Sequence, residues 1–368
     1  MNPLVPTPDI LPAAWSLIQL LLLLVFPLHL LAMNSLVGTA AVVLWARRRD
    51  GQLDRALSPH LTGALPVLMA VAVNLGVASL LFSQTLHGQF FYPATILMGR
   101  FWLAVIPLLI TAYAGLYLMQ WGARRPRRRT TLILAAILTI LLIVPFIFTN
   151  NQTMMLNLPR WTAYFNADGG TLLNLGDATL WPRYLHFIVA ALAVGGLFTA
   201  LTGYVLGRNN PYLGAYAENL GLRLFGRMTL VQIGVGMLFL WELPQPIRWL
   251  MLGGSLPATL LLVTAVSLGL ALLACSAQGL TRLCAGLLVV QVFVMSGLRE
   301  MVRHASLAEN MRLAETPMVW QSGALLIFIL VLLTGLSVIG WLVVQALQTT
   351  DVAANQEQAS EQNRALRS

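Results

Sequence analysis

Lysine is absent from this chain of 368 residues, and charged residues of all kinds make up only 10% of it. Soluble domains average about 25% charged residues, so this scarcity excludes an ordinary soluble enzyme. With only two cysteines, the chain is not a disulfide-stapled secreted domain either. Hydrophobic residues are abundant instead, at 58% of the sequence, with a mean hydropathy of +0.77. These proportions predict an integral membrane protein.

Motifs for several familiar chemistries are missing as well. The sequence contains no G-x-x-x-x-G-K-[ST] phosphate loop, no H-E-x-x-H zinc motif and no G-x-S-x-G nucleophile elbow. The C-x-x-C-H motif that attaches c-type haem is also absent, and Cys275 and Cys284 form no C-x-x-C pair. We interpret both cysteines as reduced structural thiols. Because the C-x-x-C-H motif is absent, we expect the chain itself to carry no covalently bound haem.

Long apolar runs occupy most of the chain. A helix needs about 20 apolar residues to cross a hydrocarbon core of ~30 Å. Nine segments meet this requirement: 13–46, 61–86, 92–121, 130–149, 181–207, 219–243, 254–275, 280–298 and 320–346. The predicted fold class is therefore an all-α polytopic membrane protein with nine transmembrane helices.

The basic residues indicate the orientation of the chain in the membrane. Two clusters follow the first and third predicted spans, and their members are Arg47, Arg48, Arg49, Arg55, Arg124, Arg125, Arg127, Arg128 and Arg129. Short loops rich in positive charge stay in the cytoplasm. We therefore expect a bacterial inner-membrane protein with a periplasmic N-terminus and a cytoplasmic C-terminus. The pI near 10.4 reflects these loops, so we expect the lipid bilayer, not nucleic acid, as the partner.

The sequence contains an internal duplication. LHLLAMNSLVG at 28–38 matches LHFIVAALAVG at 185–195, and NLGVASLLFSQTL at 74–86 matches QIGVGMLFLWEL at 232–243. Two shorter matches follow in the same order, and all four have offsets between 150 and 164 residues. Because four spans separate the copies, both copies have the same orientation and are related by an axis along the membrane normal.

The duplication predicts the domain organisation of the chain as two parallel four-helix repeats plus one helix. The predicted parts are a first membrane repeat (1–150), an external loop (151–180), a second membrane repeat (181–318), a ninth transmembrane helix (319–348) and a polar cytoplasmic tail (349–368). The tail has too few apolar residues to fold alone.

Two histidines occupy equivalent positions on the first helix of each repeat. His29 and His186 lie roughly 27–33 Å from the cytoplasmic ends of their helices, near the outer boundary of the hydrocarbon core. Imidazole is a common axial ligand of haem iron, and facing helices of a bundle hold such cofactors. We predict that His29 and His186 bind the iron of haem b, with Met237 as a candidate thioether ligand. Each histidine bonding only a neighbouring carbonyl group stays open as the alternative.

A second group of polar residues gathers at the outer helix ends. A quinone head group needs hydrogen-bond donors, and quinol oxidation needs a base that takes a proton. We predict that Gln84, His87 and Glu242 fill these roles as catalytic residues. Arg100, about two turns inside the third predicted span, suits a haem propionate. The alternative is an ordinary interfacial belt of aromatic and arginine side chains.

A charged run follows the eighth predicted span, from Arg299 to Glu315. Its charges are spaced three and four residues apart, as in a helix laced by ion pairs. We expect it to form a solvated extension of the helix beyond the membrane, or a docking surface for an external partner.

Nine predicted spans, two repeats and paired histidines together resemble subunit I of the cytochrome bd quinol oxidases. The segment NLGVASLLFSQTLHGQFF (74–91) is similar to the end of the second helix in that family. The family binds haem through histidines of its first and fifth helices, to which His29 and His186 correspond. Three features of the family are missing: the long external quinol-binding loop, for which only residues 244–253 remain, the acidic residues of the third helix in 92–121, and the G-R-x-P-W segment.

The resemblance implies a haem b-containing membrane subunit of a respiratory electron-transfer complex, and the three departures argue against oxygen reduction, although oxygen stays open as a substrate. Such a subunit would exchange electrons between the quinone pool and a separate, multihaem cytochrome c in the periplasm. The alternatives are a two-repeat membrane transporter or channel without cofactor, for which Asn34, Asn74 and Gln232 are the polar candidates, and a non-catalytic membrane anchor.

Overall fold

The computed structural model describes residues 3–49, 51–121, 127–166, 169–323 and 325–334, together with residues 337 and 341. The described residues form two compact units, the larger from those within 3–9 and 15–317 and the smaller from 10–14 and those from 318 onward. The larger unit contains eight helices that are long and apolar enough to cross a membrane. They are α1 (Trp15–Arg47), α2 (Gln52–Leu97), α3 (Gly99–Trp121), α4 (Arg127–Leu156), α5 (Leu180–Leu206), α6 (Pro211–Glu242), α8 (Leu256–Ala277) and α9 (Thr281–Leu307).

Eight of the nine predicted spans thus correspond to long apolar helices, which confirms an all-α polytopic membrane protein within the described part of the chain. The ninth span, 320–346, is described only in part, where Leu325–Thr334 forms a shorter apolar helix of the smaller unit. In the same unit the backbone N–H of Val319 donates to the carbonyl of Leu11 at 2.9 Å. The predicted tail, 349–368, lies outside the described residues.

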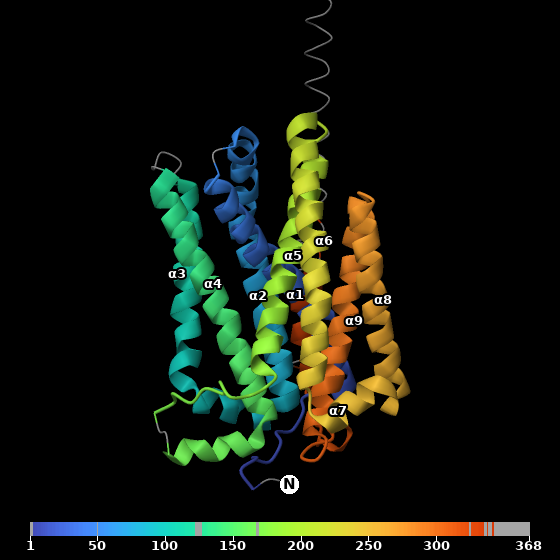
Figure 1. The fold of residues 1–368 in the computed structure, drawn as a ribbon. Coiled ribbons are helices and arrows are strands. Elements are labelled where there is room, and N and C mark those ends of the chain that lie inside the picture. The colour runs from blue at the N-terminus through green and yellow to red at the C-terminus, as the bar shows by residue number, and fades with distance from the viewer. Residues whose placement is uncertain are drawn as a thin grey trace, which may run out of the picture. The chain divides into compact units, whose positions relative to one another are not determined.

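Helices α1 and α5 form the centre of the larger unit. Helix α1 contacts α2, α4, α5 and α9, and α5 contacts α6 as well as α1, α4 and α9 (Figure 1). The two central helices meet at a pair of glycines. A Cβ atom on Gly38 would lie 1.9 Å from the carbonyl oxygen of Ala191, and one on Gly195 would lie 2.2 Å from the carbonyl carbon of Gly38. Only glycine permits this backbone contact, the kind of packing that joins helices in lipid.

Small residues also join α5 to α6. A Cβ atom on Gly203 would lie 2.4 Å from the backbone nitrogen of Glu218, and one on Gly221 would lie 2.3 Å from the backbone nitrogen of Ala200. The α6 helix begins at Pro211, where the Asn210 side chain accepts a hydrogen bond from a first-turn backbone N–H. The two helices therefore form a tightly packed hairpin, which fixes the position of the α5 residues.

Helix α2 is longer than predicted. Two spans, 61–86 and 92–121, were expected to be separated near His87, but α2 continues from Gln52 to Leu97 with one non-helical residue, His87 (φ −132°, ψ 29°). Phe90 and Phe91, just beyond this kink, are buried against the end of α4. The predicted end of the second span at residue 86 coincides with this kink, but the prediction that the third span begins at residue 92 was wrong, because residues 92–97 continue α2 and α3 begins at Gly99.

The connection between α4 and α5 is shorter than the predicted external loop, 151–180, because α4 extends to Leu156. A 3₁₀ helix, η1 (Leu158–Asn166), follows it, and the indole N–H of Trp161 donates to the carbonyl of Met154 at 2.9 Å. The Asp177 carboxylate then accepts hydrogen bonds from the backbone and hydroxyl of Thr179 just before α5. Elsewhere in this unit, α7 (Gln245–Trp249), η2 (Leu250–Gly254) and η3 (Leu313–Glu315) are short connecting elements.

Candidate functional site

The His29 side chain is held in one orientation by the neighbouring helix. Its Nδ1–H donates to the carbonyl oxygen of Ala72 on α2, at 2.8 Å. Since a carbonyl oxygen only accepts, Nδ1 carries the proton and Nε2 keeps its lone pair. Gly76 makes room for the ring, because a Cβ atom there would lie 2.7 Å from Cε1 of His29. Histidines that bind metals commonly donate the second ring N–H to a carbonyl in this way.

The His186 ring has a similar setting on α5. The glycine beside it is Gly236 on α6, where a Cβ atom would lie 3.4 Å from Cε1 of the ring. The Gln232 amide donates to the backbone carbonyl of His186 at 3.0 Å. Nδ1 of His186 is buried and has no hydrogen-bond partner within the described residues. An orphaned buried ring nitrogen costs free energy unless a ligand or water completes it.

His29 therefore packs against α2 and His186 against α6, and no ring contact between the two histidines is found among the described residues. In the described ranges, no three His, Cys, Asp or Glu side chains gather as they would around a bare metal ion. Haem brings the nitrogens of its own macrocycle and needs only one or two axial ligands. His29, whose Nδ1 carries the proton and whose Nε2 keeps its lone pair, fits the role of an axial haem ligand. His186, whose buried Nδ1 has no hydrogen-bond partner within the described residues, fits it as well.

A buried ionic cluster lies where the sequence predicted a solvated helix. Glu300 and Arg303 on α9 are only 4% and 2% exposed and form an ion pair at 3.1 Å. Arg299 forms a second ion pair with Glu300, and both guanidinium groups donate to Oε1 of Gln152 on α4, at 3.0 and 2.9 Å. The expectation of a solvated extension was wrong because partners distant in sequence, Gln152 and Ser83, cover the charges. Only the Arg312–Glu315 pair is exposed.

The ring of Phe26 lies close to both the ionic cluster and His29. The Arg299 guanidinium lies 4.3 Å from the ring centroid of Phe26, a cation–π distance. Phe26 is in turn 6.3 Å from the centroid of the His29 ring. With two arginines and one glutamate, the cluster carries an excess positive charge next to the candidate haem ligand. Its electrostatic field suits a negatively charged group nearby.

His87 lies in the protein interior and not at the outer surface. Its side chain is 1% exposed, and its ring centroid is 5.9 Å from that of His304 on α9. Neither ring nitrogen of His87, nor Nε2 of His304, has a hydrogen-bond partner within the described residues. Such a pair of imidazoles can exchange protons through water, since each ring both donates and accepts.

The remaining predicted site residues are dispersed. Gln84 is half-buried, one turn before His87 on α2, and Glu242 is half-buried at the last residue of α6. Arg100 is exposed in the first turn of α3 beside Gly169, and not two turns inside the span, because the break falls at Met98. Met237 is 67% exposed, so its thioether faces away from the helix contact around Gly236. The structure therefore does not bring Met237 to His186 as a ligand.

Sequence reasoning missed a polar end of α4. Asn150 and Asn151 are 0% exposed, and their side-chain amide nitrogens have no hydrogen-bond partner within the described residues. Oδ1 of Asn150 accepts from the backbone N–H of Asn174 at 2.7 Å. The signal was present in the sequence, because a run of amide side chains, Asn150 to Gln152, ends an otherwise apolar span.

Comparison with solved structures identifies the fold. A chain of the bd oxidase from Geobacillus thermodenitrificans matches with a TM-score of 0.66 and 14% sequence identity, over 89% of this chain and 96% of that chain. This likeness confirms the distant resemblance to bd oxidases and shows a shared fold. No protein-family model matches the chain, and no curated protein matches its sequence.

Proposed function

We propose that the chain is a haem b-containing membrane subunit of a respiratory electron-transfer complex. It would exchange electrons between the quinone pool and a periplasmic, multihaem cytochrome c partner. The observation that carries the proposal is the setting of His29, whose Nδ1–H is fixed by the Ala72 carbonyl while Gly76 leaves space beside the ring. The fold shared with a bd oxidase chain supports it.

In the proposed function, the residues of the protein hold and orient the haem. Bound at His29 and His186, haem b would supply reversible one-electron transfer. The Ala72 carbonyl keeps Nε2 of His29 unprotonated and increases its basicity. The excess positive charge of the Arg299–Glu300–Arg303 cluster stabilises negative charge on its side of the site.

Quinol oxidation releases two electrons and two protons, and the protons need acceptors. We propose that Gln84 hydrogen-bonds a quinol oxygen and that His87, one turn further along α2, takes its proton. His304, with its ring centroid 5.9 Å from that of His87, passes the proton on through water. Glu242 would act as a second base at the end of α6, and Arg100 as an anion-binding side chain at the start of α3.

The proposal includes an orientation and an internal symmetry. The arginine-rich helix ends face the cytoplasm of a bacterial inner membrane, which places the N-terminus and the histidine-bearing ends in the periplasm. The two halves are copies of one four-helix unit. The mutual backbone contact between Gly38 and Gly195, equivalent positions of the two copies, supports this symmetry.

Reduction of the purified protein by a quinol tests the proposed function. We expect an absorption spectrum of haem b that changes from oxidised to reduced form when a quinol is added. The His87→Gln variant should keep its haem but be reduced at least tenfold more slowly, because a base contributes about 10²–10⁴ to the rate. The His60→Gln variant, at an exposed position near the start of α2, is the matched control. A colourless protein that transports a solute, and loses that transport in the His29→Ala and His186→Ala variants, would support the transporter instead.

A further inference from the structure

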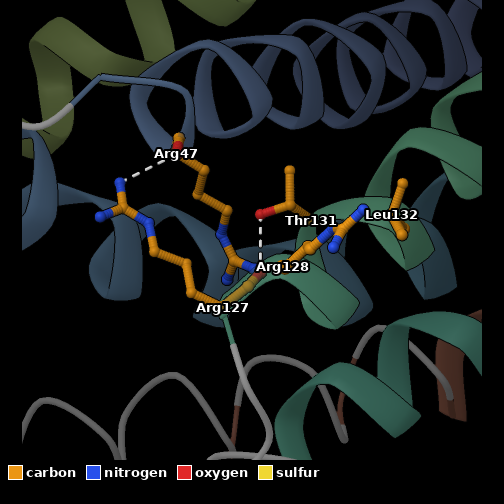
Figure 2. A pocket seen from close by; sticks show the side chains of 5 residues that line it. All are labelled: Arg47, Arg127, Arg128, Thr131 and Leu132. Carbon is orange, nitrogen blue, oxygen red and sulfur yellow. Dashed lines mark hydrogen bonds between the residues drawn. The ribbon is translucent and has the colours of Figure 1, made fainter.

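Polar side chains join neighbouring helices of the larger unit through backbone carbonyl groups. The Arg127 guanidinium donates to the carbonyl oxygen of Arg47 at 2.9 Å, which joins the start of α4 to the end of α1 (Figure 2). The Gln232 amide nitrogen joins α6 to α5 in the same way, because it donates to the carbonyl oxygen of His186 at 3.0 Å. Gln232 has a second polar atom, Oε1, which is buried and has no hydrogen-bond partner within the described residues. A buried acceptor without a donor costs free energy.

The His186 ring turns its Nδ1 edge toward the same helix. A Cβ atom on Gly236 would lie 3.4 Å from Cε1 and 3.8 Å from Nδ1 of the ring. Gly236 follows Gln232 by one turn of α6, so the two residues share the face of α6 that contacts His186. Nδ1 is buried and, in the part of the chain that the structure describes, has no hydrogen-bond partner. The two orphaned atoms, a ring nitrogen and an amide oxygen, therefore belong to residues that a hydrogen bond already joins.

The His29 site has the same arrangement with its hydrogen bond complete. There Nδ1–H donates to the carbonyl oxygen of Ala72 at 2.8 Å, and Ala72 lies four residues before Gly76, the glycine beside the ring. Gln232 likewise lies four residues before Gly236. On α2 the acceptor is a backbone oxygen, whereas on α6 the oxygen at the same distance from the glycine belongs to a side chain.

We propose that Gln232 is a positioning residue for His186, whose Nδ1–H it accepts through Oε1 when Nε2 binds haem iron. This inference rests on the proposed haem b site. A ring that binds iron through Nε2 carries its one proton on Nδ1, and this proton needs an acceptor. The last side-chain torsion of glutamine is soft, so a turn about it brings Oε1 toward the ring. The hydrogen bond fixes the orientation of the ring and increases the basicity of Nε2.

Redox titration of the purified full chain, followed by its haem absorption, tests this role with two substitutions. Gln232→Met keeps the length of the side chain but removes both polar atoms. We expect about tenfold weaker haem retention and a higher midpoint potential, because a less basic imidazole stabilises ferric iron less. Gln232→Glu keeps an acceptor oxygen but loses the amide donor. It should retain its haem and have a lower midpoint potential than the unsubstituted protein, because a carboxylate is the stronger acceptor.

The matched control is Asn74→Leu on α2, at the position that the internal duplication pairs with Gln232. The Asn74 amide is exposed and donates to the carbonyl of Ala70 in its own helix at 2.8 Å, so haem content and midpoint potential should not change. An unchanged midpoint potential in Gln232→Met, or equal haem loss in Gln232→Met and Gln232→Glu, would overturn the role of Gln232. Haem b in the unsubstituted protein would then still support the proposed function, whereas its absence there would overturn both.

Discussion

The ring of His29 fills the space that a side chain at position 76 would take. In the Gly76→Ala variant, the new Cβ atom would lie 2.7 Å from Cε1 and 2.9 Å from Nδ1, so the ring has to move off the Ala72 carbonyl. We expect a loss of roughly 1–3 kcal/mol in stability from this overpacking, together with loss of bound haem. Thermal unfolding and haem content of the purified variant measure both effects.

Gly63 provides the control for this substitution. It lies on the same helix, but no atom lies within 4 Å of a Cβ atom there. The Gly63→Ala variant should keep its haem and gain up to about 1 kcal/mol, because alanine is the better helix former. Equal behaviour of the two variants would contradict the account of the His29 site.

Within the described ranges, Glu300 is the only anion that forms an ion pair with Arg299 or Arg303. The Glu300→Gln variant leaves the buried Arg303 and the half-buried Arg299 without an opposite charge, so we expect a loss of about 3–5 kcal/mol. The matched control is Glu315→Gln, which breaks an ion pair with both side chains about 70% exposed and should cost under 1 kcal/mol. Unfolding in mild detergent measures the difference, and similar losses in both variants would show that the cluster is solvated.

At the scale of the helices, the α1–α5 contact depends on two glycines. A Cβ atom on Gly195 would lie 2.2 Å from a backbone carbon of Gly38, and backbone cannot rotate away as a side chain can. We expect the Gly195→Ala variant to separate the helices and lose at least 1–3 kcal/mol, roughly the cost of overpacking. The Gly234→Ala variant on α6, where no atom lies within 4 Å, should lose no stability and, like Gly63→Ala, gain up to about 1 kcal/mol from helix propensity. Unchanged stability of Gly195→Ala would rule out the backbone contact.

Hydropathy predicted the helices well but not where they end. Apolar runs identify eight of the spans because lipid requires about 20 apolar residues whatever the packing. The helix does kink at His87, where a span end was expected, but Phe90 and Phe91 are buried against α4 and the chain stays in α2 to Leu97. Because the third span was predicted to begin at residue 92, Arg100 was placed about two turns inside it, whereas it lies in the first turn of α3.

At the scale of the whole molecule, the arginine-rich helix ends predict which side of the membrane each loop faces. A cysteine at Phe165, which is 76% exposed in η1, should react with a membrane-impermeant maleimide on intact spheroplasts. A cysteine at Tyr212, which is 86% exposed at the start of α6, should react only after permeabilisation. The unsubstituted protein is the control, because Cys275 and Cys284 are buried. Reaction at position 212 from outside would reverse the orientation.

The candidate site was only partly predictable from the sequence. His29 and His186 follow from the duplication, which is a property of the linear sequence. The cluster around Arg303 does not, because its partners Gln152 and Ser83 are 151 and 220 residues away. A charged run on one helix looks the same in sequence whether water or another helix covers it. Only the packing of α2, α4 and α9 distinguishes the two.

Haem content per polypeptide tests the central claim most directly. Pyridine haemochrome analysis of the protein purified from its membrane should detect haem b. It should show clear losses in the His29→Ala and His186→Ala variants and full retention in His60→Ala. A folded, colourless wild-type protein, or equal haem content in all three variants, would contradict the assignment of His29 and His186 as haem ligands.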